Sequence, residues 1–143
     1  MTEYKVMFDK FKDKITDPDL LLYLEGVQQE ILISLLTSAC TKFKRLCKQN
    51  LADRDDTAKK FNFVVDDEVI DILSDIMVEY WLKPSLNNIE NLRNQLSTKD
   101  FKVFSPADLL RAIQNTYNLS RQHAKSAMNE YSFINGDWEN LKS

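Results

Sequence analysis

Apolar residues recur at intervals of three and four along most of the chain, which is the period of an amphipathic helix. The first such stripe covers residues 3–15. Asp17 can cap a second helix and Pro18 can take its first position, where no amide hydrogen is needed. The second stripe, residues 18–48, is broad enough to be buried against more than one neighbour. We expect one long helix there with a bend at Gly26, since mid-helix glycine costs about 1 kcal/mol relative to alanine.

The second half of the chain alternates between irregular and periodic segments. Residues 49–65 begin without a helical period, and we expect a charged surface loop that ends in the short extended segment FNFVV. A third helix is predicted to begin at Asp66 and to stop before Pro84, because proline disfavours a helical residue ahead of it. A shorter helix is expected over 85–96. The longest uninterrupted stripe predicts a helix over 106–131.

The start of that last helix is specified in unusual detail. Ser105 can sit at the N-cap and Pro106 at the first helical position. Asp108 resembles the acidic member of a capping box, and Phe104 and Leu109 have the spacing of a hydrophobic staple.

These elements predict an all-α bundle of about five helices with a long C-terminal helix and an extended C-terminal tail. The chain has 143 residues, which is enough to bury a core of its own. Only 2 glycines and 3 prolines leave little material for hairpins. We expect a helical domain over 1–131 and a docking tail over 132–143, whose apolar residues are Phe133, Ile134 and Trp138.

Charge and hydropathy narrow the classes of function. The net charge of −3 argues against general nucleic-acid binding, which needs a basic surface. Four basic residues cluster near the C-terminal end of the second predicted helix, where positive charge suits the negative end of the helix dipole. We expect them to form a solvated face: Lys42, Lys44, Arg45 and Lys48. The first residues are charged rather than an apolar leader, and no run approaches the roughly 18 apolar residues of a membrane span. We therefore expect a soluble protein made in the cytosol.

The sequence predicts no metal site and no disulfide. Cys40 and Cys47 lie seven residues apart on one expected helix, about 10 Å between their α-carbons, which is too far for a bond that needs less than about 7 Å. Two sulfurs and the distant His123 fall short of a zinc site. An acidic cluster in the loop lacks the glycine and the late glutamate of a calcium loop: Asp53, Asp55 and Asp56.

Catalytic motifs are also missing. There is no phosphate-cradling glycine loop, no Gly-x-Ser-x-Gly elbow and no Cys-His nucleophile pair. The acids at 66–68 suit a helix N-terminus better than paired catalytic carboxylates, because consecutive residues point around a helix. His123 has no carboxylate at helical spacing and is expected to be a surface or interface residue. We expect no catalytic residue, no cofactor and no enzymatic activity.

One segment resembles a known family. Residues 70–110 contain an apolar helix that ends in Tyr80-Trp81-Leu82 before Pro84, then LSTKDF at 96–101 and FSPA at 104–107. This order, followed by a long closing helix, resembles the head–tail connector or neck (adaptor) proteins of tailed bacteriophages. The resemblance covers about the last 75 residues. Many connectors have a glycine-rich strand-forming loop before the closing helix, and this chain lacks it.

The resemblance implies a structural virion protein, made in the bacterial host cytoplasm. It implies a homo-oligomeric ring of about twelve copies. Its partners would be the portal protein and tail or other neck proteins, with DNA at most passing through the lumen and no membrane. The interface is expected on the loop before the closing helix, on the small-residue seam of that helix and on the tail: Lys99, Phe101, Lys102, Tyr117, Ala124, Ala127, Tyr131, Phe133, Ile134 and Trp138.

Three alternatives stay open. A small DNA-recognition subunit of a packaging motor would also form a ring, although such a subunit would be expected to contain a basic helix-turn-helix. A helical regulatory or adaptor domain that binds a cellular protein fits the composition. An enzyme that uses ordinary carboxylates is the weakest alternative.

Overall fold

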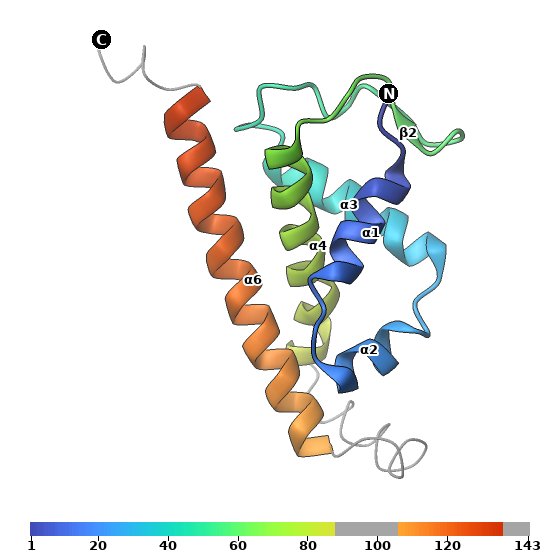
Figure 1. Cartoon of the computed structure of the whole chain (residues 1–143), viewed down its shortest axis with the longest axis vertical. Coiled ribbons are helices and arrows are strands. Elements are labelled where there is room, and N and C mark those ends of the chain that lie inside the picture. The colour runs from blue at the N-terminus through green and yellow to red at the C-terminus, as the bar shows by residue number, and fades with distance from the viewer. Residues whose placement is uncertain (88–105, 136–143) are drawn as a thin grey trace.

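The computed structural model describes residues 1–87 and 106–135, and it is a bundle of helices (Figure 1). The described helices are α1 (Tyr4–Asp13), α2 (Pro18–Leu24), α3 (Gln29–Phe43), α4 (Asp67–Asn87) and α6 (Pro106–Asn135). Two short strands, β1 (Arg54–Asp55) and β2 (Lys60–Phe61), complete the described elements. The predicted all-α class with a long C-terminal helix is confirmed.

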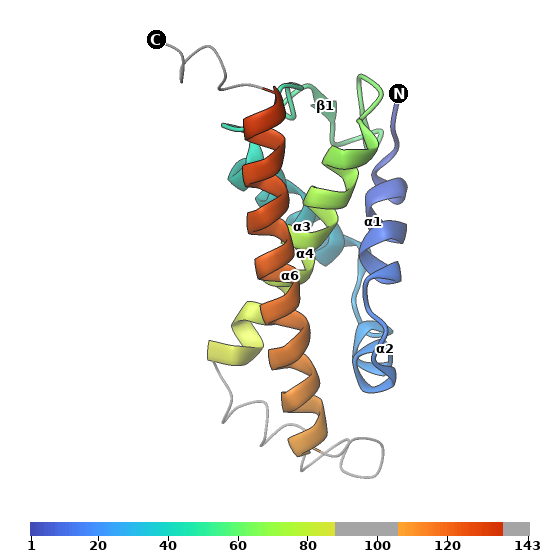
Figure 2. The same ribbon diagram turned by 60° about the vertical axis from the view of Figure 1, so that its left-hand side comes forward.

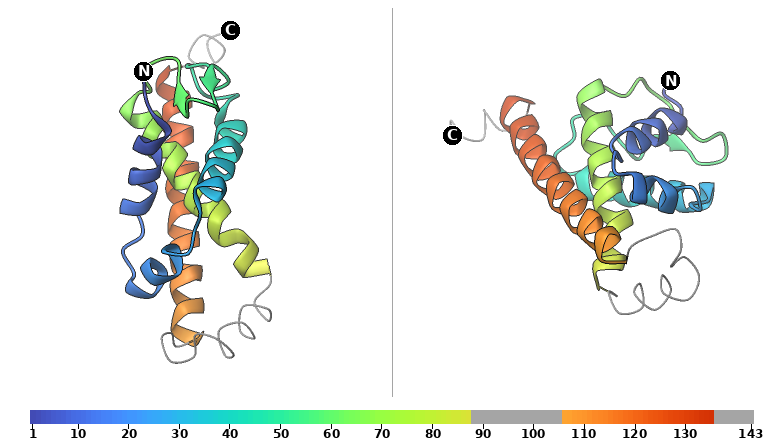
Figure 3. Two further views of the ribbon diagram at one scale, coloured as in Figure 1. Left: turned by 90° about the vertical axis from the view of Figure 1, so that its right-hand side faces the viewer. Right: turned by 60° about the horizontal axis from the view of Figure 1, so that its bottom comes forward.

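Helix α4 is the centre of the bundle. It packs against α1, α3 and α6, and every residue from 72 to 79 is buried. In Figure 3 (left), α1 and α3 flank α4 while α6 lies behind it. The two longest helices run antiparallel, since α6 begins beside the end of α4 (Figure 1). A helix that is buried on all sides, including its polar residues Ser74, Asp75 and Glu79, has to be enclosed by neighbours in this way.

The prediction of one continuous helix over 18–48 is wrong. The chain forms α2 and α3, with a non-helical link at 25–28 that contains Gly26. The link lets the buried faces of the two helices, at Leu20 and at Leu36, reach the core from different directions. Tertiary packing therefore turns the expected bend into a break.

The predicted helix end before Pro84 is also wrong. Helix α4 continues through Pro84 to Asn87. A proline inside a helix removes one backbone hydrogen bond and clashes with the carbonyl four residues earlier, so it bends the helix when packing holds both sides. The last part of α4 departs from the axis of the rest in Figure 2. The expected helix over 85–96 thus begins inside α4, and its remainder lies outside the described residues.

Helix α6 begins at Pro106, as predicted from the local sequence. The expected cap Ser105 and the staple residue Phe104 lie outside the described residues. At its other end α6 extends to Asn135 rather than stopping at 131. Residues 132–135 of the expected tail are therefore helical, and the rest of the tail lies outside the described residues.

The expected loop at 49–65 contains a small hairpin. Strands β1 and β2 pair antiparallel, with Asp55 opposite Lys60. The Asp55 Oδ1 accepts hydrogen bonds from the backbone N–H groups of Thr57 and Ala58 at 2.9 and 3.0 Å, which fixes the turn. Lys59 takes a positive φ of 58° in this turn. The predicted extended segment at 61–65 is a strand only at Phe61.

Two further sequence predictions concern the cysteines and a membrane span. Cys40 is buried and Cys47 is half-buried, and both are free thiols. Among the helices described, none combines the length and apolar character required to cross a bilayer.

Candidate functional site

The predicted interface seam on α6 packs mainly against the chain's own core. Ala124 and Tyr131 are buried, and Tyr117 and Ala127 are half-buried against the same core. This seam faces α4, the helix with which α6 shares its largest contact. A partner could not reach Ala124 or Tyr131 without displacing α6, so the expectation that these two contact a partner needs correction. The three-and-four spacing that predicted the seam is equally the signature of intramolecular helix packing.

Tyr131 anchors the far end of α6 to the end of α3. Its hydroxyl accepts a hydrogen bond from the backbone N–H of Lys48 at 3.0 Å and lies 3.9 Å from the Cys47 Sγ. Its ring meets the Phe43 ring edge to face, with centroids 5.2 Å apart. Burial raises the pKa of the Tyr131 phenol, and burial also raises the pKa of the Cys47 thiol.

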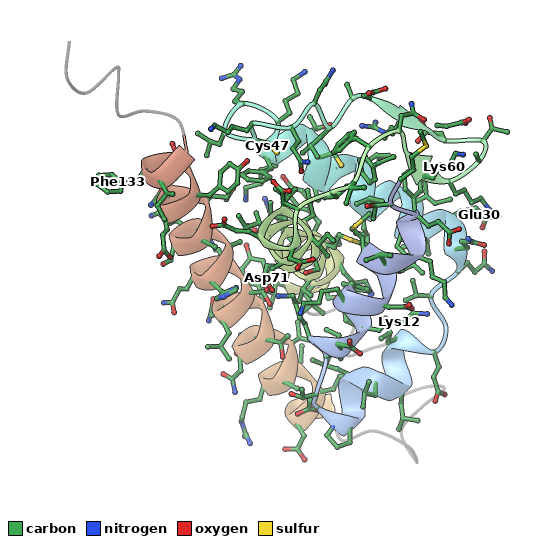
Figure 4. The ribbon with its side chains drawn as sticks, turned by 45° about the horizontal axis from the view of Figure 1, so that its top comes forward. Lys12, Glu30, Cys47, Lys60, Asp71 and Phe133 are labelled. Carbon is green, nitrogen blue, oxygen red and sulfur yellow. The ribbon has the colours of Figure 1, made fainter. Side chains whose placement is uncertain are left out.

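Other predicted interface residues lie on the outer side of the molecule. Phe133 and Ile134, on the last turn of α6, are 52% and 58% exposed. Phe133 points away from the bundle in Figure 4. Leu119, which sequence analysis did not single out, is 67% exposed on the same helix. Lys99, Phe101, Lys102 and Trp138 lie outside the described residues.

A second exposed apolar surface lies on α2 and the start of α3. Leu21 and Leu22 are half-exposed on α2, and Ile31 is half-exposed in the first turn of α3. Beside them is a hollow of about 410 Å³ whose apolar lining includes Leu24 and Val27. Figure 1 shows that the start of α3 and the helix α6 occupy opposite edges of the bundle.

An ionic cluster joins α1, α4 and α6. The Lys14 Nζ lies 2.7 Å from the Asp71 Oδ1 and 3.1 Å from the Asp75 Oδ1. The His123 Nδ1 contacts the Asp75 carboxylate, and its Nε2 lies 4.0 Å from the Asp71 Oδ2. The side chain of Asp75 is only 5% exposed. Asp71 lies between α4 and α6 in Figure 4.

The cluster has ligand atoms of the kind that metals use, but a lysine of the chain already contacts both of its carboxylates. The two carboxylates and His123 bring their ligand atoms within 4.8 Å of one another. The Lys14 ammonium occupies the space against both carboxylates at hydrogen-bond distance. A dication would have to displace this charge, so the geometry favours a structural ion-pair network. Within the described part of the chain, no serine or cysteine side chain forms a hydrogen bond with the His123–Asp75 pair, as a nucleophile would.

Sequence reasoning missed this cluster because its members come from distant segments. His123 has no carboxylate at helical spacing on its own helix, so its sequence neighbours give no sign of the contact with Asp75. Asp71 and Asp75 are four residues apart on α4, on one helix face, and that spacing was the one available signal.

Comparison with known proteins adds no identification. The chain matches no family model, no curated protein and no solved structure.

Proposed function

We propose that the chain is a structural virion protein of a tailed bacteriophage and forms a homo-oligomeric head–tail connector ring between portal and tail. The proposal starts from the resemblance of residues 70–110 to connector proteins. The observation that carries its structural part is the presence of two separate sets of exposed apolar residues, one on α6 and one on α2 and the start of α3.

We define the α6 surface as Leu119, Phe133 and Ile134, and the α2–α3 surface as Leu21, Leu22 and Ile31. A ring requires a heterologous contact, in which one patch of a subunit meets a different patch of the next subunit. Two different patches on one subunit meet that requirement, whereas one self-complementary patch would produce a two-fold dimer.

A ring subunit also has to hold its two contact surfaces rigidly relative to each other. The α6 surface is carried by a helix whose inner face packs on α4 and whose end is tied to α3 through Tyr131. Aromatic and aliphatic anchors surrounded by polar residues supply most of the binding energy in interfaces. A fixed α6 would hold Leu119 and Ile134 at a constant angle relative to the α2–α3 surface, which a closed ring needs.

Two variants test the heterologous contact. Leu119→Glu/Ile134→Glu places charge on the α6 surface, and Leu22→Glu/Ile31→Glu places charge on the α2–α3 surface. Each variant alone should fail to associate. An equimolar mixture should form a 1:1 dimer and nothing larger, because each variant retains one intact patch that fits the partner's intact patch.

The matched control is Gln114→Glu/Asn118→Glu, which adds the same charge to exposed positions on another flank of α6. This control should associate like the unmodified chain. Helical content, measured by circular dichroism, should be equal in all variants. A mixture that stays monomeric although the unmodified chain associates would rule out the head-to-tail contact.

The virion assignment needs a separate test. A phage that lacks this gene should make filled heads without tails, and the unmodified chain should restore complete particles. The Leu119→Glu/Ile134→Glu variant should not restore them, while Gln114→Glu/Asn118→Glu should. Normal particles in the absence of the chain would contradict the virion role and favour a helical domain that binds a cellular protein.

A further inference from the structure

A groove lies between α3 and the C-terminal half of α4. Its volume is about 920 Å³. The lining consists of hydroxyl and basic side chains with a few apolar ones: Ser34, Leu35, Thr37, Ser38, Thr41, Lys42, Tyr80, Lys83 and Pro84. No carboxylate is among these residues, although acidic residues outnumber basic ones by 22 to 19 in the whole chain. The groove is therefore a local basic site on an acidic protein.

Lys42 is held in place on one side of the groove. Its Nζ lies 3.1 and 3.2 Å from the two carboxylate oxygens of Glu79 and 5.5 Å from the centre of the Tyr80 ring. Glu79 is buried beneath it. These contacts restrict the long lysine side chain, so an anion that binds there would immobilise little further side-chain freedom.

Lys83 supplies the second positive charge from α4. It is exposed and forms no ion pair with any residue that the structure describes. Glu79 offsets one of the two lysine charges, so the groove retains a net positive charge that an anionic group can neutralise.

The hydroxyl groups divide into two kinds. The Thr37 Oγ1 donates to the Ser34 carbonyl and the Thr41 Oγ1 donates to the Thr37 carbonyl, each at 3.0 Å, so the protons of both threonines are engaged within α3. Ser34 and Ser38 are exposed four residues apart on the same face of α3. Their hydroxyls are available as donors beside the two ammonium groups.

We propose that this groove binds a phosphate-bearing ligand, with the phosphate held by Lys42 and Lys83 and by the hydroxyls of Ser34 and Ser38. Lysine ammonium and serine hydroxyl groups are the usual donors to phosphate oxygens. The volume lies within the range of roughly 300–1,000 Å³ that small-molecule sites occupy. A free nucleotide and the backbone of a nucleic-acid strand present the same chemistry. The proposal does not depend on ring formation.

The test compares two probes, ATP without metal and an eight-nucleotide single-stranded DNA, on the full chain at low salt. Binding is followed by the amide NMR shifts of α3 and, for the DNA, by fluorescence anisotropy. At least one probe should bind and shift the amides between Ser34 and Lys42. The affinity should fall with added salt, because charge neutralisation carries the contact.

Two variants leave the Glu79–Lys42 ion pair intact. Ser38→Glu introduces a carboxylate into the groove and should weaken binding about tenfold or more, and Lys83→Gln should weaken it about threefold to tenfold. The matched controls are Ser126→Glu and Lys125→Gln, both exposed on α6 away from the groove. They should bind like the unmodified chain.

The pattern of results identifies the source of the phosphate. Binding of ATP alone indicates a free nucleotide, whereas binding of the oligonucleotide alone, or much tighter binding of it, indicates a strand backbone. Absence of binding by both probes would overturn the proposal. Binding that Ser38→Glu reduces no more than Ser126→Glu does would also overturn it.

Discussion

The backbone N–H of Lys48 donates a hydrogen bond to the hydroxyl of Tyr131, 83 residues further along the chain, at 3.0 Å. This contact fixes the end of the longest helix to the chain segment that follows α3. The position of the exposed Phe133 and Ile134 relative to the bundle therefore depends on an internal anchor two and three residues earlier in the sequence, respectively.

Removing the hydroxyl tests this anchor. Tyr131→Phe keeps the ring against Phe43 but leaves the Lys48 N–H without its acceptor, and we expect the free energy of unfolding to fall by about 1 kcal/mol. Chemical denaturation monitored by circular dichroism measures the change. Tyr117→Phe, at a half-buried position on the same helix, is the comparison and should change stability less. Equal effects in the two variants would show that the Tyr131 hydrogen bond contributes nothing specific.

The two carboxylates of the ionic cluster should contribute differently to stability because they differ in burial. Asp75→Asn removes the buried carboxylate that Lys14 and His123 share, and we expect a loss of about 2 kcal/mol or more. Asp71→Asn removes a carboxylate that is 36% exposed, and it should cost less than about 1 kcal/mol. Urea midpoints of the two variants give the comparison. If Asp71→Asn costs as much as Asp75→Asn, the cluster does not work as a buried network centred on Asp75.

The buried thiol of Cys40 predicts a loss of stability in alkaline solution. Burial raises its pKa from 9.0 to about 12. The folded chain therefore holds this proton in a pH range where the unfolded chain releases it, so its contribution to stability is complete below pH 9 and declines as the pH rises toward 12. Cys40→Ala should reduce the steepness of this decline in denaturation midpoints. The remaining decline belongs to Tyr4, Cys47 and Tyr131, whose pKa values are also raised. An unchanged slope would contradict the assignment.

Thiol reactivity should follow burial in the same way. Both cysteines should stay reduced and react slowly with a thiol reagent at pH 8, because their raised pKa values leave little thiolate. The half-buried Cys47 should react before the buried Cys40. Mass spectrometry of timed samples resolves the order. Prompt labelling of Cys40 under native conditions would show that α3 does not bury the face on which it lies.

Features encoded by adjacent residues were predictable from the sequence, whereas features created by distant ones were not. Pro106 at the first position of α6 and the apolar period of α4 follow from local chemistry. The helical turn that continues past Pro84 depends on packing, because the proline penalty alone would end the helix. The hairpin turn relies on the Asp55 side chain and on a positive φ at Lys59, which composition did not reveal.

The same distinction between adjacent and distant residues applies to the candidate interface on α6 and to the ionic cluster. Phe133 and Ile134 were expected to contact a partner because they are apolar residues in a polar segment, and the structure exposes both side chains, although their sequence alone is equally compatible with packing on the chain's own domain. Tyr131 and Ala124 were assigned to a partner because periodicity cannot distinguish an intermolecular seam from an intramolecular one. The pairing of His123 with Asp75 joins residues 48 positions apart, and only the packing of α6 on α4 brings them together.

The central claim is that this chain associates head to tail into a closed ring. Sedimentation velocity of the full chain over a wide range of concentrations tests it most directly. We predict a shift from monomer to one large species of defined mass, without a stable dimer, and its loss in Leu119→Glu/Ile134→Glu. A chain that remains monomeric at every concentration, or that stops at a dimer, would contradict the ring.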